Sequence, residues 1–224
     1  MTDDLKVLVA KKALNYLQPG SSLGVGTGST VDFFIEELGK SRLTFSKIFS
    51  TSIRSTKKLI DQGFNVNHLS ELKEPLSIYI DGADEIDEMH CMTKGGGGAL
   101  TLEKIVAEIS STFICLVDET KLVQSLGKFP IPIEVISEAV NPIIQKIKTK
   151  YGGDAIVRKN FLTDHGNQIL DLHNLTINNP VSLEKNLNSI PGVVTNGIFA
   201  IRKANMVLVG TNSGLKILKS SGFD

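Results

Sequence analysis

Hydrophobic residues in the first half of the chain form short apolar runs that alternate with segments of helical spacing. The apolar runs predict strands over residues 22–26, 47–51, 76–80 and 112–117. Helical spacing predicts helices over 4–17, 30–38, 55–62 and 100–109, the second and third closed by Gly39 and Gly63. The run over 76–80 (LSIYI) is apolar enough for a strand covered on both faces. This alternation predicts a parallel sheet with helices on both of its faces.

The pattern changes after Pro130. Strands are predicted over 131–136, 155–158, 168–172 and 193–199, with helices over 141–150 and 182–190. This order, β-α-β-β-α-β, is the split βαβ arrangement. A last apolar strand over 206–210 is expected to return to the first sheet. We therefore predict an α/β protein whose Rossmann-like, doubly wound, mostly parallel sheet (residues 1–129 plus 205–224) carries an inserted small α+β domain of ferredoxin-like, split βαβ type (130–204).

Composition narrows the classes of function. The 224 residues include 24 basic and 24 acidic side chains, so no global charge favours nucleic acid or an anionic membrane surface. No window reaches the ~18 apolar residues of a membrane span, and residues 1–12 lack the apolar core of a secretory signal. We therefore expect a cytoplasmic protein. The two cysteines form no disulfide framework, and Cys115, inside an apolar run, is expected to be a small buried hydrophobe.

A glycine-rich segment, GVGTGST at residues 24–30, lies between a predicted strand and a predicted helix. Alternate glycines let the backbone approach a ligand, and the start of the helix favours an anion, so the segment suits a phosphate. It is no dinucleotide fingerprint, because Ser29 stands where the third glycine belongs and the next strand ends in Ser50-Thr51 rather than an acidic residue. The alternative is a tight turn with a helix cap.

Five carboxylates follow the strand over 76–80 within eight residues, DGADEIDE at 81–88. Asp87 and Glu88 are typical of a solvated loop. Asp81 differs because it adjoins a strand that we expect to be buried, and Asp84 flanks the same Gly-Ala turn. Crowded carboxylates either bind a cation or hold displaced pKa values for proton transfer, and the residues alone leave both possibilities open.

Four glycines follow Lys94 in KGGGG at residues 94–98. A disordered linker is one interpretation, since ordering four glycines costs much backbone entropy. The regular helix that follows at once, with Glu103 in its first turn, favours an anchored loop in which a lysine and backbone N–H groups face an anionic oxygen. Lys121 follows another strand and could reach a bound phosphate, although a surface lysine is the usual case. The four histidines show no metal-binding spacing.

Together these segments resemble the ribose-5-phosphate isomerase A family. The resemblance rests on ordered motifs along the whole chain, namely GVGTGST, STSIRST at 50–56, DGADEID, KGGGGAL, EKI at 103–105, DETK at 118–121, FPIPIEVI at 129–136 and IPGVVTNGIF at 190–199. The departures are mild: Ile53 and Arg54 stand in a variable stretch, and Gly98 stands where some members have alanine.

The resemblance implies a Rossmann-like domain with a small α+β domain in a homodimer or homotetramer, acting on a small sugar phosphate with no metal and no redox cofactor. It implies that Glu103 is the general base. It also implies substrate contacts for Thr27, Gly28, Ser29, Thr30, Asp81, Gly82, Ala83, Asp84, Lys94, Gly95, Gly96, Gly97 and Lys121.

From these residues we formulate a mechanism for interconverting ribose 5-phosphate and ribulose 5-phosphate. Glu103 carries the proton between C2 and C1, while Lys94 and the glycine-loop N–H groups hold the oxyanion. Asp81 moves protons among O1, O2 and the ring oxygen, and Asp84 orients the sugar hydroxyls or Lys94. The phosphate binds at residues 24–30 with help from Lys121.

Three rival interpretations remain at this stage. A sugar-phosphate sensor would need the phosphate loop but neither Glu103 nor Lys94. A nicotinamide dehydrogenase lacks support in the glycine pattern described above. A metal-dependent isomerase would use the acidic loop at 81–88.

Overall fold

The computed structural model describes residues 3–220, and backbone contacts divide the chain into two compact units. The first unit comprises Met1–Ala83, Ile105–Lys121 and Ala204–Asp224, and the second comprises Asp84–Lys104 and Leu122–Lys203. Contacts therefore group residues 84–104 and 122–129 with the inserted domain, whereas the predicted division lies at 129/130. The chain passes between the units directly after the strand that ends in Asp81.

The first unit contains a six-stranded sheet in the order β13-β12-β6-β3-β1-β2. Its strands are β1 (Ser22–Val25), β2 (Lys47–Ser50), β3 (Leu76–Asp81), β6 (Ser110–Asp118), β12 (Met206–Thr211) and β13 (Gly214–Lys219). All pairs are parallel except β12 with β13, and the pairing of β12 with β6 confirms that the chain returns to this sheet. The order reverses between β1 and β3, where doubly wound sheets bind ligands.

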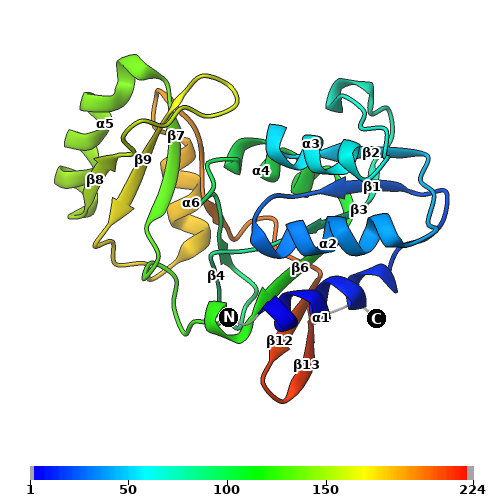
Figure 1. The fold of residues 1–224 in the computed structure, drawn as a ribbon. Helices are drawn as coiled ribbons and strands as arrows, with labels where there is room; N and C mark the ends of the chain where they lie inside the picture. Colours follow the sequence, from blue (N-terminus) through cyan, green and yellow to red (C-terminus); the bar gives the residue numbers. More distant parts are fainter. Residues whose placement is uncertain (1–2, 221–224) are drawn as a thin grey trace. The chain divides into compact units, whose positions relative to one another are not determined.

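Helices cover both faces of this sheet (Figure 1). They are α1 (Asp3–Leu14), α2 (Ser29–Lys40), α3 (Ile53–Asp61) and α4 (Leu100–Glu108), with short 3-10 turns η1 (Leu69–Glu71) and η2 (Glu119–Lys121). Leu23 and Val25 of β1 pack in one core with apolar residues of α1 and α2. Successive strand residues point to opposite faces, so Gly24 faces the other way, toward Val106 of α4. The prediction of a sheet covered on both faces is confirmed.

The predicted end of α2 at Gly39 is wrong, because the helix continues to Lys40. A Cβ at Gly39 would lie 2.0 Å from the side-chain oxygen of Gln62. This glycine therefore makes room for a neighbouring side chain rather than ending the helix.

The second unit holds a four-stranded antiparallel sheet in the order β10-β7-β9-β8. Its elements are β7 (Ile131–Val135), η3 (Ser137–Ala139), α5 (Val140–Lys146), the π-helical turn η4 (Ile147–Tyr151), β8 (Asp154–Val157), β9 (Gln168–His173), α6 (Pro180–Asn188) and β10 (Val193–Asn196). Ile143 of α5 and Leu187 of α6 pack in one core with β7 and β9, so both helices cover the same face. This confirms the predicted split βαβ domain.

One predicted strand, 193–199, is wrong as a single element because it breaks at Gly197. Its last two residues form β11 (Ile198–Phe199), which pairs with β5 (Met92–Thr93) beside β4 (Glu85–Ile86) in a small sheet that the sequence did not predict. The Gly197 N–H donates to the Pro132 carbonyl at 2.8 Å, and its own carbonyl accepts from the Lys94 N–H at 2.8 Å. A Cβ at Gly197 would lie 2.3 Å from the Lys94 carbonyl oxygen. Glycine at this break therefore allows the backbone of Lys94 to approach closely.

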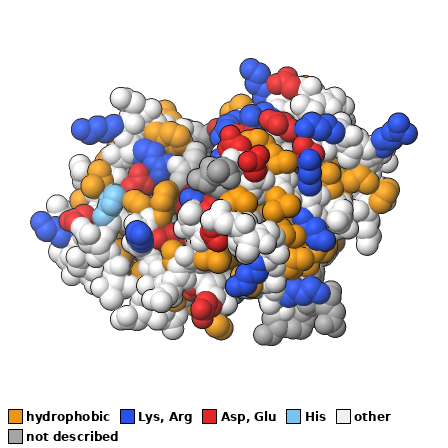
Figure 2. Space-filling view, turned by 60° about the horizontal axis from the view of Figure 1, so that its bottom comes forward, with side chains coloured by type: hydrophobic (Ala, Val, Ile, Leu, Met, Phe, Trp, Pro, Cys, Tyr) orange, Lys and Arg blue, Asp and Glu red, His pale blue; other side chains and the backbone are white. Residues whose placement is uncertain are grey.

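One prediction about the thiols is confirmed, since Cys115 is a small buried residue in the core. Figure 2 shows acidic and basic side chains interspersed on the displayed face rather than gathered by sign. Cys91 and Cys115 are buried and unbridged, and burial raises the pKa of the Cys91 thiol, helped by the nearby Asp87 carboxylate. None of the helices within residues 3–220 has the length and apolar character needed to cross a membrane.

Candidate active site

In the first unit, Asp81 ends β3 at the point where the strand order reverses, and its side chain is fully buried. Its Oδ1 accepts hydrogen bonds from the backbone N–H of Thr27 at 3.1 Å and of Gly82 at 2.7 Å. Its Oδ2 accepts a hydrogen bond from the Tyr79 hydroxyl. Donors from two neighbouring strand ends therefore hold this carboxylate in one orientation and tie it to the glycine-rich loop.

Gly26 leaves the space that this carboxylate occupies. A Cβ at Gly26 would lie 1.9 Å from both Cγ and Oδ1 of Asp81. We expect Gly26→Ala to displace Asp81 and to lower the free energy of unfolding by about 1–3 kcal/mol, as overpacking does elsewhere. Denaturant unfolding measures the loss. Gly82→Ala is the control, because its Cβ would meet only the Leu116 carbonyl oxygen at 3.6 Å; equal stability of the two variants would contradict the prediction.

The glycine-rich loop leads into α2 with an open helix start. Gly28 precedes the helix with a φ of 122°, a conformation that suits glycine, and no side chain caps the helix. The first N–H groups of an uncapped helix have no partner inside it and carry partial positive charge. The Thr27 N–H already donates to Asp81, so an anion would bind to the N–H groups that follow it, from Gly28 into the first turn of α2.

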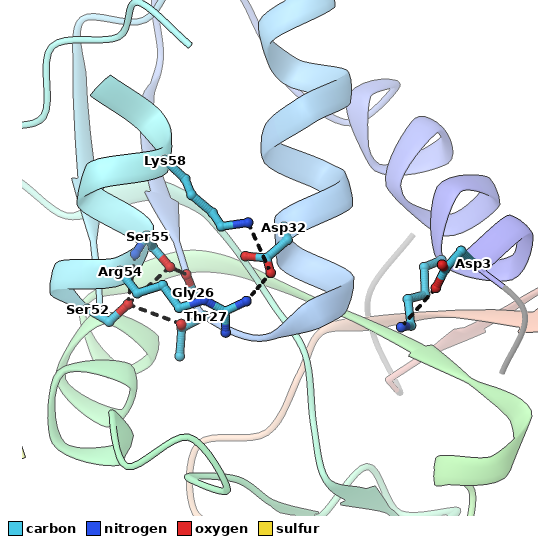
Figure 3. Close-up of polar contacts among 9 residues, drawn as sticks. Asp3, Gly26, Thr27, Asp32, Ser52, Arg54, Ser55 and Lys58 are labelled. Atoms are coloured by element: carbon cyan, nitrogen blue, oxygen red, sulfur yellow. Dashed lines mark hydrogen bonds and ion pairs between the residues drawn. The ribbon is translucent and has the colours of Figure 1, made fainter. Parts of the chain in front are cut away.

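Side chains from the start of α3 hold this loop in place (Figure 3). The Ser55 hydroxyl donates to the Gly26 carbonyl at 2.7 Å, and the Ser52 hydroxyl donates to the Thr27 hydroxyl at 3.1 Å. Figure 3 also shows Arg54 and Lys58 reaching Asp32 of α2, with Lys58 Nζ at 3.3 Å from Oδ2. Two cations thus share one carboxylate beside the loop.

Lys121 lies in η2, directly after β6. The Lys121 side chain makes no hydrogen bond or ion pair with the part of the chain from 3 to 220, whereas Asp118 accepts hydrogen bonds from both the N–H and the hydroxyl of Thr120. Because β1, β3 and β6 are parallel, their carboxyl ends share one edge of the sheet. Lys121 therefore follows the same edge as the glycine-rich loop, two strands away.

In the second unit, Glu103 and Lys94 form a buried ion pair. Each residue is 2% exposed, and Lys94 Nζ lies 3.2 Å from Glu103 Oε2. The ammonium also lies 5.5 Å from the centre of the Phe199 ring. Pairing offsets part of the desolvation cost of two buried charges. Glu103 thus points into the protein beside Lys94 rather than into solvent.

The glycine loop after Lys94 has defined hydrogen bonds and is not a linker. The Gly96 N–H donates to Asp84 Oδ2 at 2.8 Å, and the Gly98 N–H donates to the Gly95 carbonyl at 2.8 Å. Within residues 3–220 the Gly97 N–H donates to no protein acceptor. This narrows the expected oxyanion donors, because the N–H of Gly96 is already used by Asp84.

Glu85 and Asp87 of the acidic loop have structural partners, whereas Glu88 is exposed. Glu85 is buried and accepts from the backbone N–H groups of Gly127 at 2.8 Å and Phe129 at 2.7 Å. Asp87 Oδ1 accepts from the N–H groups of Met89 and Cys91 at 2.9 and 2.8 Å. No cluster of three or more His, Cys, Asp or Glu side chains suited to a metal ion occurs in the described part of the chain.

The predicted site residues contact one another within each unit. Thr27 meets Asp81 in the first unit, and Lys94 meets Glu103 in the second. Sequence reasoning missed Tyr79, although residues i and i+2 of a strand share a face and Tyr79 stands two places before Asp81. It also assigned no role to Ser52 or Ser55, whose partners lie more than twenty residues away.

An open helix start at the reversal point of a doubly wound sheet and a buried carboxylate–lysine pair define an α/β enzyme for a phosphorylated substrate. Residues 47–214 match the family described as ribose 5-phosphate isomerase A (phosphoriboisomerase A). The chain is 47% identical over 217 residues to the ribose-5-phosphate isomerase A of Methylibium petroleiphilum, covering 97% of this chain and 98% of that protein.

Two solved structures are similar over nearly the whole chain. Ribose 5-phosphate isomerase A from Neisseria gonorrhoeae is 42% identical with a TM-score of 0.95, covering 98% of this chain and 97% of that one. A D-ribose-5-phosphate isomerase in complex with phospho-erythronic acid is 37% identical with a TM-score of 0.93, covering 97% and 98%. The chain belongs to the ribose 5-phosphate isomerase A family. Membership makes it an isomerase rather than a sugar-phosphate sensor.

Proposed function

We propose that this chain interconverts ribose 5-phosphate and ribulose 5-phosphate through an ene-diolate, with Glu103 as the proton carrier. The observation that carries the proposal is the buried Glu103 carboxylate, 3.2 Å from the Lys94 ammonium, in a chain of this family. A carboxylate and an ammonium in one dry site supply both groups that the reaction needs, a base for a C–H proton and a cation for the oxygen that gains charge.

Glu103 acts on the carbon skeleton of the open-chain sugar. Its carboxylate takes the C2 proton, the electron pair of that bond forms the C1–C2 double bond, and negative charge moves onto O1. Glu103 then delivers a proton to C1, and solvent deuterium can replace this proton while the carboxyl group holds it. At the same time O2 gives its own proton to O1 and becomes the ketone oxygen. One base on one face of the ene-diolate is sufficient for both transfers.

Lys94 and the Gly97 N–H stabilise the charge that develops on the sugar oxygens. Lys94 is held by the hydrogen bond from its N–H to the Gly197 carbonyl, and the loop after it is held by Asp84. Donors that are oriented before the reaction cost no reorganisation in the transition state. Asp84 orients the sugar through this loop and through its own contacts with the hydroxyl groups.

Asp81 and the glycine-rich loop have two further roles, in opening the sugar ring and in binding the phosphate. Asp81 moves protons among O1, O2 and the ring oxygen and so opens the furanose. Residues 27–30 bind the phosphate at the start of α2, and Lys121 supplies a second charge to it. The phosphate is remote from C1 and C2, so its binding energy positions the reacting carbons.

The central test follows ribose 5-phosphate by NMR in deuterated water with chelator-treated protein. We expect ketose to form with deuterium incorporated at the carbon that receives the proton, and we expect the rate to be unchanged after exhaustive chelation. The Glu103→Gln variant is the blank. Binding of ribose 5-phosphate without ketose formation would reject the proposed reaction, and loss of turnover on chelation that returns with added metal would favour a metal-dependent mechanism.

We also propose that the protein works in the cytoplasm as a homodimer or homotetramer. The proposal rests on family membership and on the two buried, unbridged cysteines, which suit a reducing compartment. Light scattering coupled to gel filtration measures the assembly, and a mass of 24.3 kDa, that of one chain, would contradict it. We expect phospho-erythronic acid, which is bound in the similar structure, to compete with ribose 5-phosphate for this protein as well.

A further inference from the structure

Arg158 follows β8 in the second unit and is rigidly held by Asp171 of β9. Its Nε donates to Asp171 Oδ2 at 2.9 Å, and its Nη2 donates to Oδ1 of the same carboxylate. Such a two-point pair fixes the plane of the guanidinium as well as its position. The remaining nitrogen, Nη1, donates to the Gly96 carbonyl at 3.0 Å. Nη1 also makes a longer contact of 3.5 Å with the Gly95 carbonyl, so a rigid side chain holds the backbone of the glycine loop, most closely at the Gly96 carbonyl.

That hydrogen bond determines the direction of a neighbouring N–H group. The carbonyl of Gly96 and the N–H of Gly97 belong to one planar trans peptide unit and point in opposite directions. The preceding peptide unit is held as well, because the Gly96 N–H donates to Asp84 Oδ2. Both peptide units beside Gly96 are therefore oriented by charged side chains, and the Gly97 N–H points away from Arg158.

A glycine run has no conformational preference of its own that would maintain this orientation. The hairpin after β8 supplies a second contact, since the Phe161 ring centre lies 5.3 Å from the Arg158 guanidinium carbon. The same ring packs against Gly98, where a Cβ would lie 2.2 Å from Phe161 Cζ. Arg158 thus binds the backbone of the loop, and the neighbouring Phe161 ring contacts its last glycine.

We propose that Arg158 is a positioning residue for catalysis, which aims the Gly97 N–H at the oxyanion of the ene-diolate. The inference rests on the proposed function, because it requires that the glycine loop faces the reacting oxygens. Arg158 itself touches no substrate. Its effect reaches the reaction through one peptide unit, and it therefore acts on kcat rather than on binding of the phosphate.

The test is steady-state kinetics of Arg158→Ala and Arg158→Lys with ribose 5-phosphate. Removing an oxyanion donor costs about 10²–10³-fold in kcat, so loosening one should lower kcat by roughly 10- to 100-fold. We expect KM and the inhibition constant of inorganic phosphate to stay within about threefold, since neither depends on the oriented donor. Arg158→Lys, which cannot hold Asp171 and Gly96 together, should fall between Arg158→Ala and the wild type.

Chemical rescue separates positioning from folding. Added guanidinium at low concentration should restore part of the kcat of Arg158→Ala, whereas a variant that is merely unfolded gains nothing from it. Lys159→Ala, an exposed neighbour on the same hairpin, is the matched control and should keep wild-type kinetics. A folded Arg158→Ala with wild-type kcat would overturn the inference while leaving the proposed function intact. A wild type without isomerase activity would overturn the function itself.

Discussion

Replacing Glu103 by Gln should abolish nearly all turnover while leaving the fold and substrate binding in place. The amide keeps the size of the side chain and can still accept a hydrogen bond from Lys94, but it cannot take a proton from carbon. A positioned general base contributes about 10²–10⁴-fold, so kcat should fall by at least that range. KM should change little because the phosphate and hydroxyl contacts remain. The measurement is initial rates of ketose formation across ribose 5-phosphate concentrations.

Glu108→Gln is the matched control for this result. Glu108 lies on the same helix, α4, but is exposed, so the change removes one carboxylate without touching a buried pair. It should leave kcat and KM unchanged. If Glu103→Gln keeps more than about a tenth of wild-type kcat, general-base catalysis by Glu103 is the wrong assignment, given the usual contribution of such a group.

Replacing Lys94 by Met should lower both catalysis and stability. The change removes the ammonium that lies 3.2 Å from Glu103 Oε2, and breaking one side of a buried pair costs about 3–5 kcal/mol of unfolding free energy. The loss of an oxyanion-stabilising cation should also lower kcat by about 10²–10³-fold. Denaturant unfolding and steady-state kinetics measure the two effects on the same sample.

The double variant Lys94→Met/Glu103→Gln distinguishes these two contributions. It no longer buries an unpaired carboxylate, so it should recover much of the lost stability, yet it should remain as inactive as Glu103→Gln alone. Lys128→Met, at an exposed lysine of the second unit, is the control for loss of one positive charge. A rise in KM with kcat unchanged would make Lys94 a binding residue only.

Long apolar runs made most of the fold predictable. The predicted strand over 76–80 is one residue shorter than the observed β3, and the predicted helix over 100–109 is one residue longer than α4. These segments carry their own periodicity, so no partner is needed to recognise them. The strands β4 and β5 were missed because each has only two residues, too few to show a period, and β11 was predicted only as the end of a longer strand. Such short strands are defined only by their hydrogen-bonded pairing with one another in the folded chain.

For the site too, features with a local sequence pattern were predictable, whereas contacts between distant residues were not. Residues 24–30 and Asp81 stood out because glycines and charges directly after apolar strands are unusual, and Lys94 stood out because four glycines and a regular helix follow it. The hydrogen bond from Arg158 to the Gly96 carbonyl joins residues 62 positions apart, and no local pattern announces it. The need for glycine at position 26 was also not predictable. It arises because the Asp81 carboxylate fills the space where a Cβ would lie.

The amino-acid sequence by itself determined which chemical groups this protein places at the ends of its strands, because strand periodicity and chain order bring those ends to one edge of a sheet. The tertiary structure alone decided which of these groups remain available to a ligand. Asp81 accepts a hydrogen bond from the Thr27 N–H and Asp84 accepts one from the Gly96 N–H, whereas the Gly97 N–H has no protein acceptor within residues 3–220. A polar group that is buried must find a partner, and that partner is chosen by packing between segments far apart in the chain.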